Sequence, residues 1–331
     1  VRRGDNYVDL SKAAPELPQD MIGLLTAGAL DQADKAAQAA GDDALIPAAG
    51  VTYLPPVPNP PKIPCCGLNY RDHAIETNMP IPDYPIIFMR SATSLAAHNT
   101  PMILPKAASD YDYEAELAGG IGKAGRHIAE ANALDHVAGY SCFNDGSIRS
   151  YQFKAPQWTL GKNFDASGGF GPELVTPDEL PNGVGDLQIQ CRLNGKTLQN
   201  STTKQHIFDV PRVIEVLSEV MTLEVGDVII MGTPPGVGSA RTPNIWMKDG
   251  DVCEIEIEGI GILSNPIVSY PNSAETYKAL MKLDFIVVSE LFMTPTTDIA
   301  DIVLPAAWGM EHEELGYWPG WYQEIRAHPK L

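Results

Sequence analysis

The sequence of 331 residues is poor in long apolar segments and in basic residues. No uninterrupted apolar run reaches the ~18 residues that a membrane-spanning helix needs, so we expect no membrane-embedded role. Only 23 Lys and Arg stand against 42 Asp and Glu, which gives a formal net charge of −19. A nucleic-acid-binding surface needs clustered basic residues, so we also expect no nucleic-acid partner. An anionic ligand would have to be held by local cations.

Cysteine is also scarce, and its spacing excludes two common uses. The chain has five cysteines, an odd number without zinc-type spacing, and adjacent Cys65 and Cys66 are unsuited to a structural disulfide. No apolar signal segment follows Val1. A reducing, cytoplasmic location fits this pattern best.

The positions of the prolines and the alternation of apolar with polar residues divide the chain into three parts. We expect a small N-terminal unit with a Pro-rich linker at 1–60, a catalytic domain at 61–271, and a C-terminal extension of uncertain origin at 272–331. Six prolines between 55 and 64 make the linker stiff and extended. In the first unit, the pattern predicts a strand near 7–10 and helices near 19–25 and 30–40.

In residues 61–271 apolar and polar residues mainly alternate, which is the pattern of β-strands. Apolar residues alternate from Leu187 to Leu193 and lead into Asn194-Gly195, a strong hairpin signal. One helix interrupts the strands behind Pro211, with a single apolar stripe made by Val213, Val216, Leu217 and Val220. The sequence therefore predicts a β-rich α+β domain with few helices.

Two glutamates and an aspartate indicate a metal site. Glu114 and Glu116 stand at i and i+2, so on a strand both side chains point to one face, and Asp145 could complete the shell from a neighbouring segment. Oxygen ligands alone suit Mg²⁺, Mn²⁺ or Ca²⁺ and disfavour zinc. The competing interpretation is a solvated strand face.

A histidine and a lysine are candidates for the chemistry. His73 and Glu76 stand one helical turn apart, and a histidine held by a carboxylate can act as a general base on water. Lys162, in Gly161-Lys162-Asn163-Phe164-Asp165, is a compact cation suited to stabilising an oxyanion. Taken alone, the first two could be a helix-surface pair and the third an ordinary surface lysine.

Five ordered blocks lie between residues 60 and 270. Besides the Glu114–Glu116 segment, these blocks are Asn69-Tyr70-Arg71-Asp72-His73, Asn144-Asp145-Gly146-Ser147-Ile148-Arg149-Ser150-Tyr151-Gln152, Leu223-Glu224-Val225-Gly226-Asp227 and Gly232-Thr233-Pro234-Pro235-Gly236-Val237-Gly238. Together they resemble the fumarylacetoacetate hydrolase family. The resemblance implies a mixed β-roll or flattened barrel with the metal at its mouth, and a homodimer. The glycine-rich block lacks the lysine of a phosphate loop, so no nucleotide is inferred.

The resemblance also implies an activity. It points to a hydrolase that cleaves a C–C bond in a small acylpyruvate-like or β-diketo acid, as in the catabolism of aromatic compounds. In that reaction Mg²⁺, Mn²⁺ or Ca²⁺ would stabilise an enolate while His73, oriented by Glu76, activates a water. Tyr70 would contact substrate, and Thr233 either places its hydroxyl against a substrate carboxylate or only belongs to a tight turn. Arg149 and Gln152 either hold a substrate carboxylate or stabilise their own loop.

Alternatives from the same scaffold stay open. Decarboxylation, hydration and isomerisation of oxo acids share the enolate, and a catalytically silent binding or scaffold protein is a hypothesis of another class. Residues 280–310 separately resemble a fragment of a molybdopterin oxidoreductase, too short to enclose a cofactor. Arg90 stands where family members often carry lysine, and His98 either contacts substrate or is structural. The Pro-rich segment 79–85 could form part of a lid.

Overall fold

The computed structural model describes residues 1–269, 281–290, 297–305, 314–317 and 325–328. The chain divides into two compact units, Val1–Tyr270 and Pro271–Leu331. No helix within the described residues is long and apolar enough to cross a membrane.

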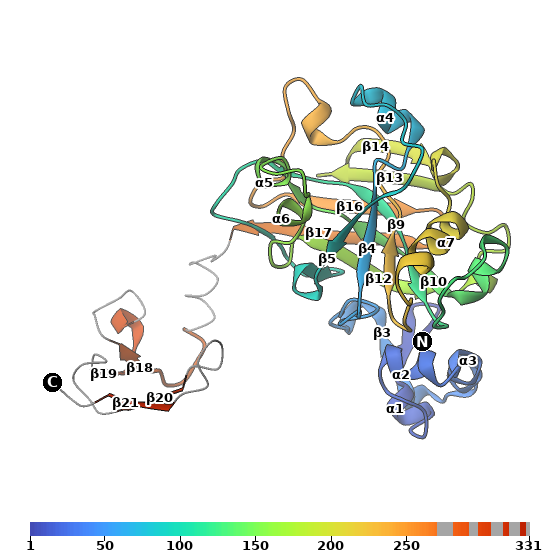
Figure 1. Cartoon of the computed structure of the whole chain (residues 1–331). Helices are drawn as coiled ribbons and strands as arrows, with labels where there is room; N and C mark the ends of the chain where they lie inside the picture. The colour runs from blue at the N-terminus through green and yellow to red at the C-terminus, as the bar shows by residue number, and fades with distance from the viewer. Residues whose placement is uncertain (270–280, 291–296, 306–313, 318–324, 329–331) are drawn as a thin grey trace. The chain divides into compact units, whose positions relative to one another are not determined.

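A seven-stranded sheet forms the centre of the first unit (Figure 1). Its strand order is β5-β4-β15-β9-β10-β12-β6, with β4 parallel to β15, β6 parallel to β12 and the other neighbours antiparallel. The strands are β4 (Ile63–Gly67), β5 (Ile86–Arg90), β6 (Leu95–Ala97), β9 (Ala115–Ile121), β10 (Val137–Asn144), β12 (Gly168–Val175) and β15 (Val228–Ile230).

A second sheet of five strands packs against the first. Strands β13, β16 and β17 contact β9, β10 and β12 of the larger sheet, so that one core lies between the two sheets. This arrangement confirms the β-rich α+β roll predicted from the sequence. In the order β14-β13-β16-β17-β7 the strands are β14 (Lys196–Thr202), β13 (Gln188–Leu193), β16 (Val252–Ile257), β17 (Gly261–Ser269) and β7 (Met102–Leu104).

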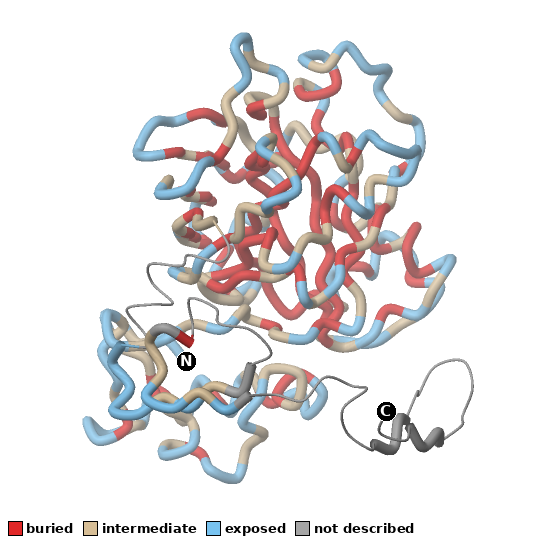
Figure 2. The backbone as a smooth tube through the Cα atoms, turned by 90° about the vertical axis from the view of Figure 1, so that its left-hand side faces the viewer, coloured by how far each residue is buried: buried red, intermediate tan, exposed pale blue. Residues whose placement is uncertain are grey.

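The core is formed by side chains that alternate between the two faces of the strands. Leu117 and Tyr113 are fully buried on one face of the segment that carries Glu114 and Glu116, as period 2 requires. Phe143 and Phe170 pack ring to ring between β10 and β12, with centroids 5.9 Å apart. Figure 2 shows the buried backbone concentrated in these central strands. The acidic residues therefore stand on a rigid framework.

The predicted hairpin and helix are both present. Asn194 and Gly195 have φ angles of 51° and 77° and join β13 to β14, with Leu193 opposite Lys196. Helix α7 (Val210–Val220) begins behind Asp209, whose side chain accepts a hydrogen bond from the Arg212 amide at 3.0 Å. The face of α7 that carries Val213, Val216 and Leu217 is buried, whereas Val220, predicted on the same stripe, is 66% exposed because it is the last residue of the helix.

The N-terminal segment forms a small α+β layer of its own. Strands β1 (Arg2–Arg3), β2 (Asn6–Val8) and β3 (Leu45–Pro47) make an antiparallel sheet. The expected helices are present as α2 (Met21–Thr26) and α3 (Leu30–Ala39), preceded by α1 (Leu10–Ala13). Residues 51–62 contain no helix or strand, as the proline pattern predicts.

The described residues of the second unit include two pairs of strands. Strands β18 (Val287–Glu290) and β19 (Ile302–Pro305) are parallel, and β20 (Glu314–Tyr317) and β21 (Ile325–His328) are antiparallel. Part of the segment that resembles a molybdopterin oxidoreductase, at 291–296 and 306–310, lies outside the described residues, as does 272–280 of the predicted extension. The origin of this unit stays a prediction.

Candidate active site

Strands β9 and β10 bring the three acidic residues together. The strands are antiparallel with Asn144 opposite Ala115, so Asp145 emerges beside Glu114 and its amide donates to the Glu114 carbonyl at 2.9 Å. One carboxylate oxygen from each of Glu114, Glu116 and Asp145 lies within 4.8 Å of the others, and all three residues are buried. The cluster predicted from the sequence therefore exists.

These carboxylates fit a hard divalent cation. All the donors are oxygens, the set that Mg²⁺, Mn²⁺ and Ca²⁺ prefer. Glu116 has no ion-pair partner in the described part of the chain, and burial together with Asp145 and Glu114 raises its pKa well above the usual range. A bound cation would relieve this crowding of like charges.

The turn after β15 supports Glu116. The amide of Gly232 donates to Glu116 Oε2 at 2.5 Å. Gly232 has φ +91°, and a Cβ there would lie 2.7 Å from the Cβ of Asn69 and 2.8 Å from the Cys66 carbonyl oxygen. Only glycine lets the backbone approach the carboxylate at this point.

Lys162 lies between two of the acidic residues. It is the last residue of α6 (Thr159–Lys162), and its Nζ lies 2.5 Å from Glu114 Oε2 and 2.6 Å from Asp145 Oδ2. Burial lowers the pKa of Lys162, but the two carboxylates outweigh burial and raise it overall. The ammonium therefore stays charged beside the cluster.

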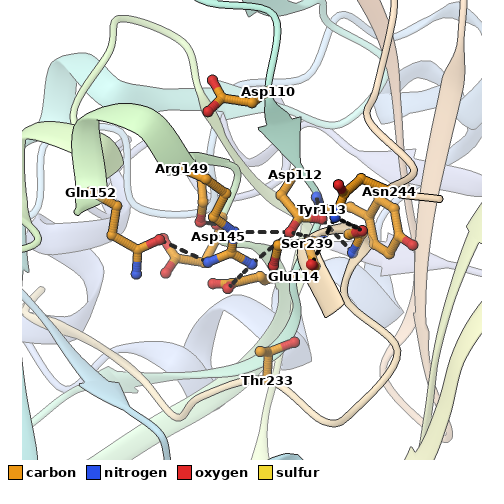
Figure 3. A network of polar contacts seen from close by, with 12 residues as sticks. Asp110, Asp112, Tyr113, Glu114, Asp145, Arg149, Gln152, Thr233, Ser239 and Asn244 are labelled. Atoms are coloured by element: carbon orange, nitrogen blue, oxygen red, sulfur yellow. Dashed lines mark hydrogen bonds and ion pairs between the residues drawn. The ribbon is translucent and has the colours of Figure 1, made fainter. Parts of the chain in front are cut away.

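Arg149 joins the cluster to residues around it. It begins α5 (Arg149–Gln152), and its guanidinium contacts Glu114 Oε1 at 2.6 Å and Asp112 Oδ2 at 2.8 Å. Its Nη1 also donates to Gln152 Oε1 at 2.8 Å, as the dashed lines in Figure 3 show. Arg149 therefore uses its donors within the protein, and the Gln152 nitrogen faces away from it (Figure 3).

His73 and Glu76 form the expected pair on α4 (Arg71–Glu76). The Nδ1 of His73 lies 3.1 Å from Glu76 Oε2, and His73 is 9% exposed. Both oxygens of Glu76 also accept from the Gly236 amide, at 2.9 and 3.1 Å. Glu76 thus holds the histidine and fixes α4 to the glycine-rich loop at the same time.

A pocket of about 100 Å³ opens over the cluster. His73, Arg149, Gln152, Lys162 and Thr233 line it together with the three acidic residues. Tyr70 is fully buried, packs edge-on against the His206 ring and is absent from the pocket wall. The structure therefore offers no direct geometry for its expected contact with substrate.

Two charged residues of the site have only weak signals in the sequence. The side chain of Arg90 is completely buried, with Nη1 2.5 Å from Asp145 Oδ1, and so takes the place of the lysine expected there. Asp112 forms an ion pair with Arg149 and also accepts hydrogen bonds from the amides of Gly238 and Ser239, at 2.6 and 2.9 Å. The spacing of Asp112 two residues before Glu114 is a usable signal, whereas nothing near Arg90 in the sequence indicates its partner.

No sequence pattern indicates the aromatic wall of the pocket. Phe88 and Trp158 line the pocket and pack edge to face, with centroids 5.8 Å apart. A Cβ on Gly67 would lie 2.2 Å from the Trp158 ring, so this glycine makes room for the indole. His98 accepts from the Ser264 amide at 3.0 Å and packs against Tyr53, a structural setting.

Known proteins share this sequence and fold. The family model "Fumarylacetoacetate (FAA) hydrolase C-terminal" matches residues 62–268. A mitochondrial oxaloacetate tautomerase of Xenopus laevis is 42% identical over 272 residues, which cover 81% of this chain and 84% of the relative.

Two solved structures extend the likeness to the fold. Fumarylacetoacetate hydrolase from psychrophilic Exiguobacterium antarcticum has a TM-score of 0.70 and 32% identity, covering 81% of this chain and 94% of that one. Maleylpyruvate hydrolase from Sphingobium, in complex with manganese and pyruvate, has a TM-score of 0.69 and 28% identity, covering 81% and 95%. With the family model, the relatives and the carboxylate cluster in agreement, the chain belongs to the fumarylacetoacetate hydrolase family of enzymes.

Proposed function

We propose that this enzyme interconverts the keto and enol forms of a small 2-oxo diacid, with oxaloacetate as the substrate. The observation that carries the proposal is the pocket of about 100 Å³, which places His73 and Lys162 around the three carboxylates. This volume is far below the ~300–1,000 Å³ of a pocket for a drug-sized ligand, so it favours an acid of few carbons. The similarity to the Xenopus tautomerase supports the same substrate.

His73 is suited to carry the proton. Because Glu76 accepts from Nδ1, the proton of neutral His73 is held on Nδ1 and Nε2 is left with a free lone pair. Keto–enol exchange requires removal of a proton from the carbon beside the carbonyl and its return to carbon or oxygen. His73 Nε2 accepts that proton and gives it back, and no water is consumed.

The cations of the site stabilise the charge that develops on the substrate. A divalent cation held by Glu114, Glu116 and Asp145 would act as a Lewis acid on the carbonyl. Lys162 stands beside the same carboxylates with its charge retained, so its ammonium stabilises negative charge as it forms on the substrate oxygen. Mg²⁺ and Mn²⁺ are the proposed ions, with Ca²⁺ as an alternative.

Polar side chains on the pocket wall supply donors for a substrate carboxylate. Gln152 accepts from Arg149 through its oxygen, so its NH₂ group is left to donate into the pocket. Thr233 presents a hydroxyl on the same wall. Arg149 acts on substrate through Gln152 and Glu114, which its guanidinium holds in place.

A C–C hydrolase for an acylpyruvate-like or β-diketo acid is the second candidate. The His73–Glu76 pair favours it, because the same Nε2 could activate a water. The solved structure with the same fold that is named maleylpyruvate hydrolase supports a hydrolase. Decarboxylation or hydration of an oxo acid would use the same cluster, whereas a silent binding protein would not need the complete set of residues.

The deciding experiment compares the two reactions in one preparation. Ketonisation of enol-oxaloacetate is followed by ultraviolet absorbance with Mn²⁺ and with EDTA, and cleavage of acetylpyruvate is measured in parallel. We expect Mn²⁺-dependent ketonisation that His73→Gln reduces, while His136→Gln, on a histidine outside the pocket, leaves the rate unchanged. Cleavage of acetylpyruvate without accelerated ketonisation would make the hydrolase the better assignment.

Assembly and location are further proposals. A homodimer is expected from the family, and light scattering of the purified protein tests it. The five cysteines are free in the structure, which suits the reducing cytoplasm expected from the sequence. The Xenopus relative is named as mitochondrial, so fractionation of cells has to distinguish the two compartments.

A further inference from the structure

Gln199 is a buried polar residue next to the pocket that no sequence motif singles out. It lies on β14 and is completely buried. Its Oε1 accepts from the Ala115 amide at 2.9 Å, and its Nε2 donates to Thr233 Oγ1 and to the Pro234 carbonyl, both at 2.8 Å. One amide group thus connects the segment of the metal-binding glutamates to the loop that carries Thr233.

The partners of Gln199 determine which way its amide faces. The Ala115 N–H can only donate, so it requires the side-chain oxygen. The Pro234 carbonyl can only accept, so it requires the NH₂ group. In the opposite orientation the Ala115 N–H would face the NH₂ group and the Pro234 carbonyl would face the side-chain oxygen. Neither pair could form a hydrogen bond, so the cost would be comparable to two lost hydrogen bonds.

This orientation also determines the direction of the Thr233 hydroxyl. Because Oγ1 accepts from Gln199, its single proton is donated elsewhere. Within the described residues, no hydrogen bond donated by this hydroxyl is present, and Thr233 lines the pocket at 6% exposure. The hydroxyl proton is therefore available to an acceptor bound in the pocket.

We propose that Gln199 is a positioning residue that fixes the Thr233 hydroxyl as a donor to a carboxylate of the bound oxo acid. The inference rests on the proposed function for the substrate class and adds how the site recognises it. Without Gln199, the hydroxyl could rotate and donate to the Pro234 carbonyl, which would otherwise lack its partner. The substrate would then lose a hydrogen bond to its charged group.

A double-mutant cycle tests the coupling. A hydrogen bond to a charged group is worth enough to raise KM for oxaloacetate about 10- to 100-fold, and we expect this rise in Gln199→Met and in Thr233→Val at saturating Mn²⁺. The double variant should show no further rise, because Gln199 acts through Thr233. Thr233→Ser keeps the hydroxyl and should restore most of the affinity. Mn²⁺ affinity, measured by electron paramagnetic resonance, should be unchanged in Thr233→Val.

Additive effects in the cycle would overturn the proposal, since they would show that Gln199 only supports the fold. So would a KM for Gln199→Met equal to that of the wild type. If Gln199→Met does not fold, Gln199→Glu is the substitute. Its carboxylate still accepts from the Ala115 amide and also accepts a hydrogen bond from the Thr233 hydroxyl, so the same rise in KM is expected. If the wild type does not act on oxaloacetate, the proposed function fails, and calorimetric binding of oxalate to the Mn²⁺-loaded variants tests Gln199 independently.

Discussion

Replacing Glu116 by glutamine should stabilise the metal-free protein and abolish its response to metal. Glu116 is buried within 4.8 Å of two other carboxylates and has no ion-pair partner in the described structure. Burial and the two carboxylates raise the pKa of Glu116 well above its usual range, so at neutral pH the folded protein holds a proton that the unfolded chain releases. Each pKa unit of this difference costs about 1.4 kcal/mol of stability and a glutamine carries no such cost, so we expect Glu116→Gln to gain roughly 1–3 kcal/mol. The glutamine oxygen can still accept from Gly232.

Thermal unfolding with EDTA and with Mn²⁺ measures both effects. In a domain of this size ~1 kcal/mol shifts Tm by about 2–4 °C, so Glu116→Gln should melt several degrees above the wild type in EDTA. Mn²⁺ at 100 times its Kd should stabilise the wild type by about 2.7 kcal/mol and the variant by much less. Glu219→Gln, on an exposed glutamate of α7, is the matched control. A variant that melts below the wild type in EDTA, or that responds equally to Mn²⁺, would refute the reasoning.

Three other substitutions test the rest of the site. His73→Gln should lower kcat for ketonisation about 10²- to 10⁴-fold in a steady-state assay while Mn²⁺ affinity is kept, and loss of Mn²⁺ binding would contradict its role as the proton carrier. Arg90→Met leaves Asp145 Oδ1 buried without its cation and should cost about 3–5 kcal/mol in urea unfolding, so an unchanged midpoint would show that the pair is dispensable. Gly67→Ala should push Trp158 from its place and lower kcat/KM for oxaloacetate, and unchanged kinetics would mean that the indole does not shape the pocket.

The charge of the site favours a bound cation. Four buried carboxylates, counting Asp112, face the three buried cations Arg90, Arg149 and Lys162. With all four carboxylates ionised the cluster would carry one net negative charge in a region of low dielectric, which is why the pKa of Glu116 is raised, and a bound cation would favour its ionised form. Stability is given up here for binding, a common exchange at active sites.

Local patterns in the sequence are enough to predict much of the framework. The Asn194-Gly195 hairpin, the helix behind Pro211 and the pairing of His73 with Glu76 depend on neighbours in the chain, and all are present. The i and i+2 spacing of Glu114 and Glu116 likewise places both side chains on one face of their segment. Asp145, predicted to complete the shell from a neighbouring segment, lies beside both glutamates in the structure.

The contacts of the site that the sequence did not predict join residues far apart in the chain. Arg90 meets Asp145 across 55 positions, Gln199 meets Ala115 across 84, and Glu76 meets Gly236 across 160. No periodicity or motif can report such pairs, because the order of strands in the two sheets, rather than the distance along the chain, brings them together. The sequence by itself determined which residue types could bind metal and move a proton. Only the tertiary structure decided which cation neutralises which carboxylate and which way the hydroxyl of Thr233 faces, since both depend on partners from distant parts of the chain.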